Sequence, residues 1–145
     1  MKPQPAPRHV QEMALCILFD EAPHELEGRT YIQKLMFAFQ QEVGENWFVF
    51  EAGDYGPFAK GLYPVVDYCI ENQYVTEEEI KDDDGRIRYH YSAGPAIDDV
   101  FGHAEHDDLR AAARDVFDEY PTEDLTDLLD AVYTEYPAWA RNSVY

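Results

Sequence analysis

Two strand-like runs joined by a turn dipeptide lie in the middle of the chain, and they restrict its possible folds strongly. YVTEEEIK at 74–81 and RIRYHYS at 86–92 flank Asp84-Gly85, a dipeptide suited to the positive-φ positions of a tight hairpin turn. Because alternate strand residues share a face, one side of the second run carries Ile87, Tyr89 and Tyr91. The opposite side carries Arg86, Arg88 and His90. We therefore expect a β-hairpin over 74–91 with a basic face.

Helical spacing of apolar residues precedes this hairpin. Apolar side chains recur three and four residues apart over about 8–20 and again over about 30–43, which predicts two amphipathic helices. Thr30 followed by Gln33 is a capping-box pattern and marks the start of the second helix. The proline-rich residues 1–7 are expected to form a flexible arm.

A short strand and a third helix are expected next. WFVF at 47–50 is rich in β-forming residues and predicts a strand. Pro57 is expected to open a helix that runs to about Asn72, with Pro64 as an irregularity inside it.

The chain after the hairpin is helical. Pro95 is expected to open a helical turn through Phe101. Two helices follow at about 106–119 and 122–136, and Thr122 is the expected N-cap of the second.

The order helix, helix, strand, helix, hairpin, helices is that of a winged helix-turn-helix. We expect an α+β fold in one domain over 8–145, with a C-terminal helical extension. We also expect a homodimer formed through the first helix and the C-terminal helices.

IQKLMFAFQ at 32–40 and DYGPFAKGLYPVVDYCIENQYV at 54–75 resemble the opening of the YwgA-like family and, more distantly, Panacea or SocA-like antitoxin domains. Those proteins pair a KL-aromatic helix with a YGP-aromatic turn that leads into a helix and a wing. The match covers about half the chain, and its most specific piece is Tyr55-Gly56-Pro57-Phe58. RIRYHYSAGPAI also resembles the wings of small repressors, with Ser92-Ala93 in place of the usual Thr. The resemblance implies a winged-helix fold and, for the antitoxin-like relatives, neutralisation of a partner protein.

Acidic residues dominate the composition. The chain has 30 Asp and Glu against 11 Lys and Arg, a formal net charge of −19. Such a surface suits a cytoplasm with molar salt, where charge is screened within about 3 Å and mainly preserves solubility. An acidic mimic of nucleic acid is the alternative interpretation. Because every protein of a halophile carries this background, only local charge bears on whether DNA is a partner.

The cationic and aromatic residues of this sequence suggest two binding hypotheses. A DNA-binding transcriptional regulator would contact double-stranded DNA through its cations and one tyrosine, namely Arg29, Lys34, Lys60, Tyr63, Arg86 and Arg88. Against this, the outward side of the third helix also offers Asp67 and Glu71, and the arginines of the hairpin can instead pair with neighbouring acids. An antitoxin-like or adaptor module would bind a protein partner through aromatic side chains, namely Trp47, Tyr55, Phe58 and Tyr63.

Other chemistry has little support in the sequence. His103 and His106 are spaced for a metal, but no third ligand is evident, so neither a metal nor a cofactor is expected. Cys16 and Cys69 have apolar neighbours and are expected to be buried. We find no nucleophile elbow, phosphate loop or dinucleotide fingerprint, and no enzyme is expected. No run is long enough to span a membrane, so a cytoplasmic protein is expected.

Overall fold

The computed structural model describes residues 4–101, 106–121 and 124–143. Its elements are those of a mixed α+β fold, as expected. The helices are α1 (Arg8–Glu21), α2 (Arg29–Val43), α3 (Leu62–Glu71), α4 (Asp98–Phe101), α5 (Asp107–Glu119), α6 (Leu125–Glu135) and the 3-10 helix η1 (Pro137–Ala140). The strands are β1 (Leu26–Glu27), β2 (Glu51–Gly53), β3 (Gly56–Phe58), β4 (Val75–Lys81) and β5 (Ile87–Ala93).

The expected hairpin is present as β4 and β5, which pair antiparallel from Val75 opposite Ala93 to Lys81 opposite Ile87. Its turn is wider than a two-residue loop: Asp82 N–H donates to Arg86 O over 2.8 Å, and Gly85 N–H donates to Asp82 O over 3.0 Å. Gly85 has φ +85, a conformation that glycine adopts without steric cost.

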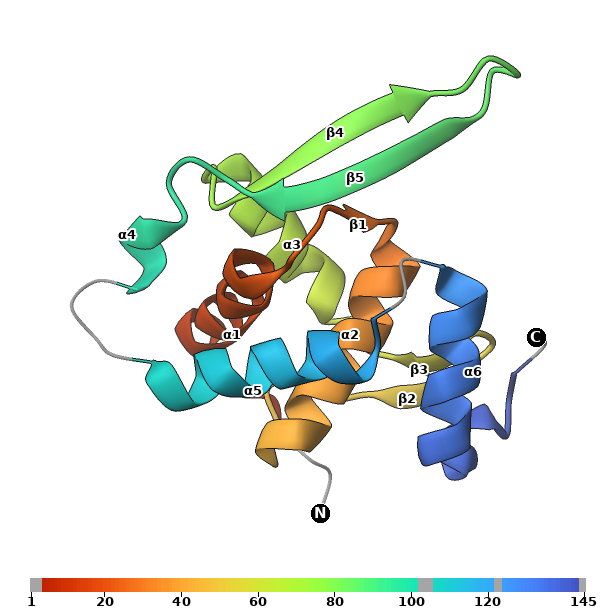
Figure 1. Ribbon diagram of the computed structural model, residues 1–145. Helices are drawn as coiled ribbons and strands as arrows, with labels where there is room; N and C mark the ends of the chain where they lie inside the picture. The colour runs from red at the N-terminus through yellow and green to blue at the C-terminus, as the bar shows by residue number, and fades with distance from the viewer. Residues whose placement is uncertain (1–3, 102–105, 122–123, 144–145) are drawn as a thin grey trace.

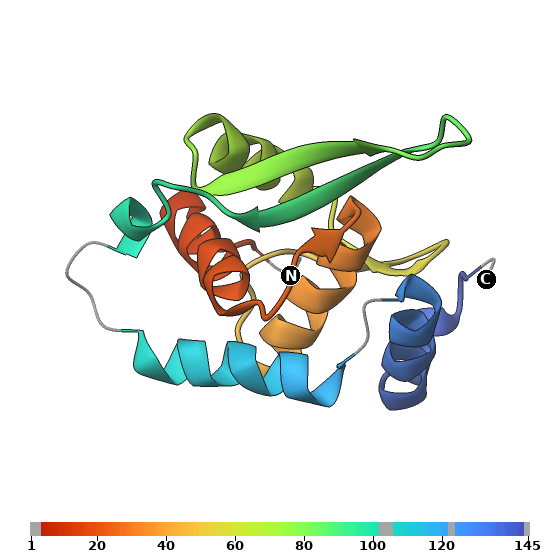
Figure 2. The same cartoon turned by 45° about the horizontal axis from the view of Figure 1, so that its top comes forward.

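A short strand that the sequence did not predict completes the sheet. β1 pairs antiparallel with β5, which gives the strand order β1-β5-β4. The sheet lies on one side of the molecule and α5 on the opposite side, with α1 and α2 between them (Figures 1 and 2).

The central helix of the core is α2. Its residues from Tyr31 to Gln40 are all buried, although three of them, Gln33, Lys34 and Gln40, are polar or charged. The helix packs against α1, α5, α6, β1 and β3, which explains why every side of it is covered. Because it contacts so many elements, α2 positions most of the cavity described below.

The predicted strand at 47–50 is wrong. These residues form no strand, and side chains in place of a neighbouring strand bind the backbone of Trp47 and Phe48. Gln40 accepts from Phe48 N–H over 2.9 Å and donates to Phe48 O over 3.0 Å. Trp47 O accepts from Gln11 Nε2 over 2.9 Å. The strands of this region are β2 and β3, which form a separate two-stranded hairpin with Gly56 at φ +86.

The predicted start of the third helix is also wrong. Pro57 lies in β3, and α3 begins at Leu62. Pro64 therefore stands in the first turn of α3, where its missing N–H has no helical acceptor to lose, and it does not interrupt the helix.

Two predicted caps differ from those observed. Gly28, at φ +84, precedes α2, and Thr30 lies inside the helix with no capping side chain at its start. Asp124 caps α6 by accepting from Asp127 N–H over 3.1 Å. The predicted cap, Thr122, lies outside the described residues.

Candidate functional site

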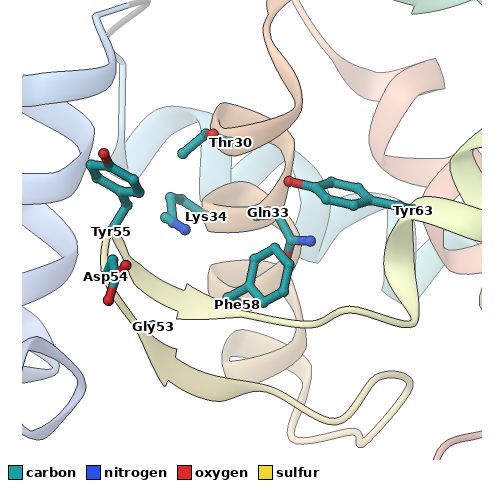
Figure 3. Close-up of a pocket in the computed structure, with 8 residues that line it drawn as sticks. All are labelled: Thr30, Gln33, Lys34, Gly53, Asp54, Tyr55, Phe58 and Tyr63. Atoms are coloured by element: carbon teal, nitrogen blue, oxygen red, sulfur yellow. The ribbon is translucent and has the colours of Figure 1, made fainter. Parts of the chain in front are cut away.

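A cavity of about 490 Å³ opens between α2, the β2–β3 turn and the start of α3. Thr30, Gln33 and Lys34 of α2 form one wall, and Figure 3 shows the other side formed by the hairpin and by Tyr63. The remaining lining residues are Gly53, Asp54, Tyr55 and Phe58. Its size is within the usual range of small-molecule sites.

The Lys34 side chain is almost completely buried at this cavity, with 1% of its surface exposed. Its Nζ donates to Pro57 O over 2.8 Å. Among the described residues no carboxylate lies within 4.0 Å of this ammonium. Burial lowers the pKa of Lys34 from 10.5 to about 8, because the charged form loses its hydration. The sequence predicted Lys34 as a phosphate contact, and the structure instead places it inside the protein.

Gln33, next to Lys34, holds the segment that leads into α3. Its Nε2 donates to Ala59 O, and its Oε1 accepts from Ala59 N–H, each over 2.8 Å. Together with the Lys34–Pro57 contact, this pair joins the two sequence segments that carry the family resemblance. Sequence analysis missed both Gln33 and Gln40 in this role. The sequence signal that could have indicated this role is that both are polar residues in a helix rich in apolar side chains.

Arg29, at the start of α2, forms ion pairs and a hydrogen bond with three neighbouring side chains. Its Nη2 lies 2.6 Å from Asp67 Oδ1 and 3.2 Å from Glu77 Oε2, and its Nε donates to Tyr91 Oη over 3.1 Å. Tyr91 Oη in turn donates to Glu77 over 2.7 Å. Burial lowers the pKa of Arg29, but the hydrogen bonds more than offset this effect and leave its pKa raised. The guanidinium therefore links α2, α3, β4 and β5.

Arg88 is also paired with acids. Its Nη2 lies 2.9 Å from Asp82 Oδ1 and its Nη1 lies 3.2 Å from Glu27 Oε1. The hydrogen bond to Asp82, followed by that to Glu27, raises its pKa. On the same face His90 Nδ1 lies 2.8 Å from Glu25 Oε2. The face that the sequence predicted to be basic is thus partly neutralised by β1 and the segment before it.

The other predicted DNA contacts are scattered. Arg86 is exposed in the hairpin turn, and Lys60 is exposed just before α3. Tyr63 is half-buried in the cavity wall, where its ring packs edge-on against Phe58. The Arg29 guanidinium lies 5.7 Å from the Tyr63 ring centre.

The predicted partner-binding aromatics separate into two groups. Trp47 is buried at 3% exposure against Phe39, so its ring belongs to the core. Tyr55 is 54% exposed, and Phe58 and Tyr63 are half-buried beside it around the cavity.

Exposed apolar side chains that the sequence analysis did not assign to a site lie on β5. Ile87 is 50% exposed and Tyr89 is 41% exposed, and both border a groove of about 450 Å³ that reaches Leu125 at the start of α6. The signal for them in the sequence was the strand face that Ile87, Tyr89 and Tyr91 share. Only Tyr91, at the other end of that face, is buried.

The two cysteines are buried, as expected, and the structure brings them together. Cys16 of α1 and Cys69 of α3 have their sulfurs 4.0 Å apart. The hydrogen bond to Cys69, and then burial, raises the pKa of Cys16. A raised pKa disfavours the thiolate of Cys16. Both cysteines are buried and act as small apolar side chains.

The described part of the chain contains neither a cluster of metal ligands nor a membrane-spanning helix. No group of three or more His, Cys, Asp or Glu side chains there is arranged to hold a metal ion. His106 precedes α5, and His103 lies outside the described residues. None of the described helices is long and apolar enough to cross a membrane.

Comparison with known proteins adds no further assignment: no protein-family model and no curated protein sequence matches this chain.

Proposed function

We propose that this protein is a winged-helix regulatory module that binds a partner protein through Ile87 and Tyr89, two exposed apolar side chains of β5. The observation that carries the proposal is the exposure of Ile87 and Tyr89 side by side on β5, next to a groove. Apolar side chains that share a strand face and border a concave surface are typical of protein interfaces.

The chain order supports the winged-helix assignment. α1, β1, α2, α3 and the β4–β5 hairpin follow one another, and β1 adds to β5 to give the order β1-β5-β4. This is the order of elements in winged helix-turn-helix domains, in which a hairpin follows the third helix. The small β2–β3 hairpin is an insertion between the second and third helices of that plan.

Charge favours a protein over DNA as the partner. Arg29 and Arg88 already pair with acidic side chains, and Lys34 is buried. A phosphate that approached Arg29 would have to compete with Asp67 and Glu77. Since phosphate contacts supply most of the affinity of non-specific DNA binding, the loss of three of the five predicted cations weakens that hypothesis.

Site-specific photo-crosslinking in cells that naturally express the protein tests the proposal. A benzophenone amino acid at position 89 is expected to give an adduct of discrete mass with one protein. The same group at Glu78, which lies on the opposite face of the hairpin, serves as the matched control and is expected to give none. Ile87→Asp should remove the adduct at position 89. Equal labelling from both positions, or none from position 89, contradicts a partner on this face.

Binding to duplex DNA is the second candidate function, and the exposure of Arg86 in the hairpin turn favours it. From this place a side chain can reach a phosphate or a minor groove. If the protein regulates transcription directly, it should retain duplex DNA at the salt concentration of its source cell, and Arg86→Ala should weaken this binding. Absence of any retained duplex there excludes the candidate.

A further inference from the structure

The cavity beside Lys34 combines a positive charge with aromatic walls. Lys34 is its single cationic lining residue and Asp54 its single acidic one, while Tyr55, Phe58 and Tyr63 supply three rings. In Figure 3 the Lys34 side chain leaves α2 toward the β2–β3 hairpin, with Tyr55 and Asp54 on one side and Phe58 and Tyr63 on the other. All eight lining residues belong to the described part of the chain.

The ammonium of Lys34 has unused hydrogen-bonding capacity. It carries three N–H donors, and one of them is directed to Pro57 O. Within the described ranges, the other two donors have no partner. A buried charge that lacks an opposite charge is costly, so a fold that retains one at a cavity is typical of a binding site.

The chemistry of the cavity selects one class of anion. A single ammonium matches the single negative charge of a carboxylate. A phosphate dianion would require further donors, and Asp54 at the same cavity would repel its two negative charges more strongly than the single charge of a carboxylate. The three rings favour a flat apolar group attached to the acid, because aromatic rings pack face to edge against one another.

We propose that this cavity binds a small aromatic carboxylic acid, with the carboxylate at Lys34 Nζ and the ring among Tyr55, Phe58 and Tyr63. The cavity shares the lining residue Thr30 with the groove beside β5, but neither Ile87 nor Tyr89 lines it, so this inference does not depend on the proposed function. It assigns the protein an effector pocket between α2, the β2–β3 hairpin and Tyr63 of α3.

Titration with phenylacetate and with its neutral isostere phenylacetamide tests the charge requirement. At constant ionic strength and pH 7, amide chemical shifts of the cavity residues should report phenylacetate binding at least tenfold tighter than phenylacetamide binding. Inorganic phosphate is expected to bind more weakly than phenylacetate. Equal affinities for the acid and the amide, or a phosphate affinity that equals that of the acid, overturn the proposal.

Variants then locate the site. Lys34→Met should weaken phenylacetate binding much more than phenylacetamide binding, because only the acid loses an ion pair, and so remove the preference for the acid. Lys81→Met, which removes an exposed charge at the far end of β4, is the matched control and should preserve the preference. Tyr55→Ala changes an exposed ring and should weaken both ligands. A preference that survives in Lys34→Met contradicts the proposal, and if that variant does not fold, the comparison of acid with amide on the unaltered protein still decides.

Discussion

Gln33 and Ala59 form two hydrogen bonds of 2.8 Å, in which a side-chain amide pairs with a backbone amide as a neighbouring strand would. The pair is buried, and it fixes the segment between β3 and α3 against α2. Gln40 pairs with Phe48 in the same manner one segment earlier. Irregular backbone can be buried here because α2 supplies its missing partners.

Gln33→Leu is expected to lower the free energy of unfolding by about 2–4 kcal/mol, because it leaves a buried N–H and a buried C=O without partners. Chemical denaturation measures the change. Gln41→Leu, at an exposed position of the same helix, is the control and should change stability by less than about 0.5 kcal/mol. Equal effects of the two substitutions would show that the pair contributes nothing specific.

Arg29→Met is expected to destabilise the contact between α2 and the hairpin, because it leaves Asp67 and Glu77 without their shared cation. The substitution should also change the pKa of Tyr91. Burial, followed by the hydrogen bond to Glu77, raises the pKa of Tyr91 to about 12, and Arg29 opposes this rise. The pKa of Tyr91 should therefore increase further in the variant, as a titration of ring-labelled tyrosine by NMR can measure. An unchanged or lower value contradicts the network.

Lys34 is expected to impose a specific pH dependence on stability. Its pKa is about 8 in the folded protein and near 10.5 when unfolded, so the unfolded chain binds more protons between these values. Stability should therefore rise with pH across this window, by up to about 3 kcal/mol for the full shift. The comparison is between denaturation curves of the unaltered protein and of Lys34→Met, which lacks the group. Parallel pH profiles for the two proteins would refute the lowered pKa.

Glu119 should make stability fall as the pH rises, the opposite of the effect expected for Lys34. Its hydrogen bond with Glu135, and then burial, raises its pKa from 4.5 to about 7. The folded state therefore holds the proton more tightly, so this stabilisation is full below pH 4.5 and is lost as the pH rises through about 7. Glu119→Gln should flatten stability between these values, whereas Glu78→Gln on the hairpin should not. NMR titration of the Glu119 carboxyl carbon measures the pKa directly.

Salt should stabilise the protein strongly. A net charge of −19 repels itself, and the repulsion is screened as the Debye length falls from about 10 Å at 0.1 M to about 3 Å at 1 M. The midpoint of thermal unfolding should increase between 0.1 M and 2 M KCl. A midpoint that does not change over this range would remove the argument for adaptation to salt.

The local sequence pattern was sufficient to predict those helices and strands that depend on neighbouring residues alone. The helices at 8–21 and 29–43 and the hairpin around Asp84-Gly85 were predicted to within a few residues, because periodicity and turn chemistry act over short distances. The strand at 47–50 was wrong for the opposite reason. Its composition suits a strand, but the backbone of Phe48 binds the side chain of Gln40 in α2 instead of a neighbouring strand.

The candidate site depended on contacts between distant segments. Residue type alone identified Lys34 as a cation, and its position beside Leu35 and Met36 was compatible with either a surface or a core. Only the tertiary structure decided that α2 is covered on every side, because that outcome requires α5 and α6, which lie far along the chain. The sequence by itself determined the first two helices, the β4–β5 hairpin and the acidity, since these follow from short-range chemistry and composition. Burial of a charge beside three rings is a property of the assembled fold.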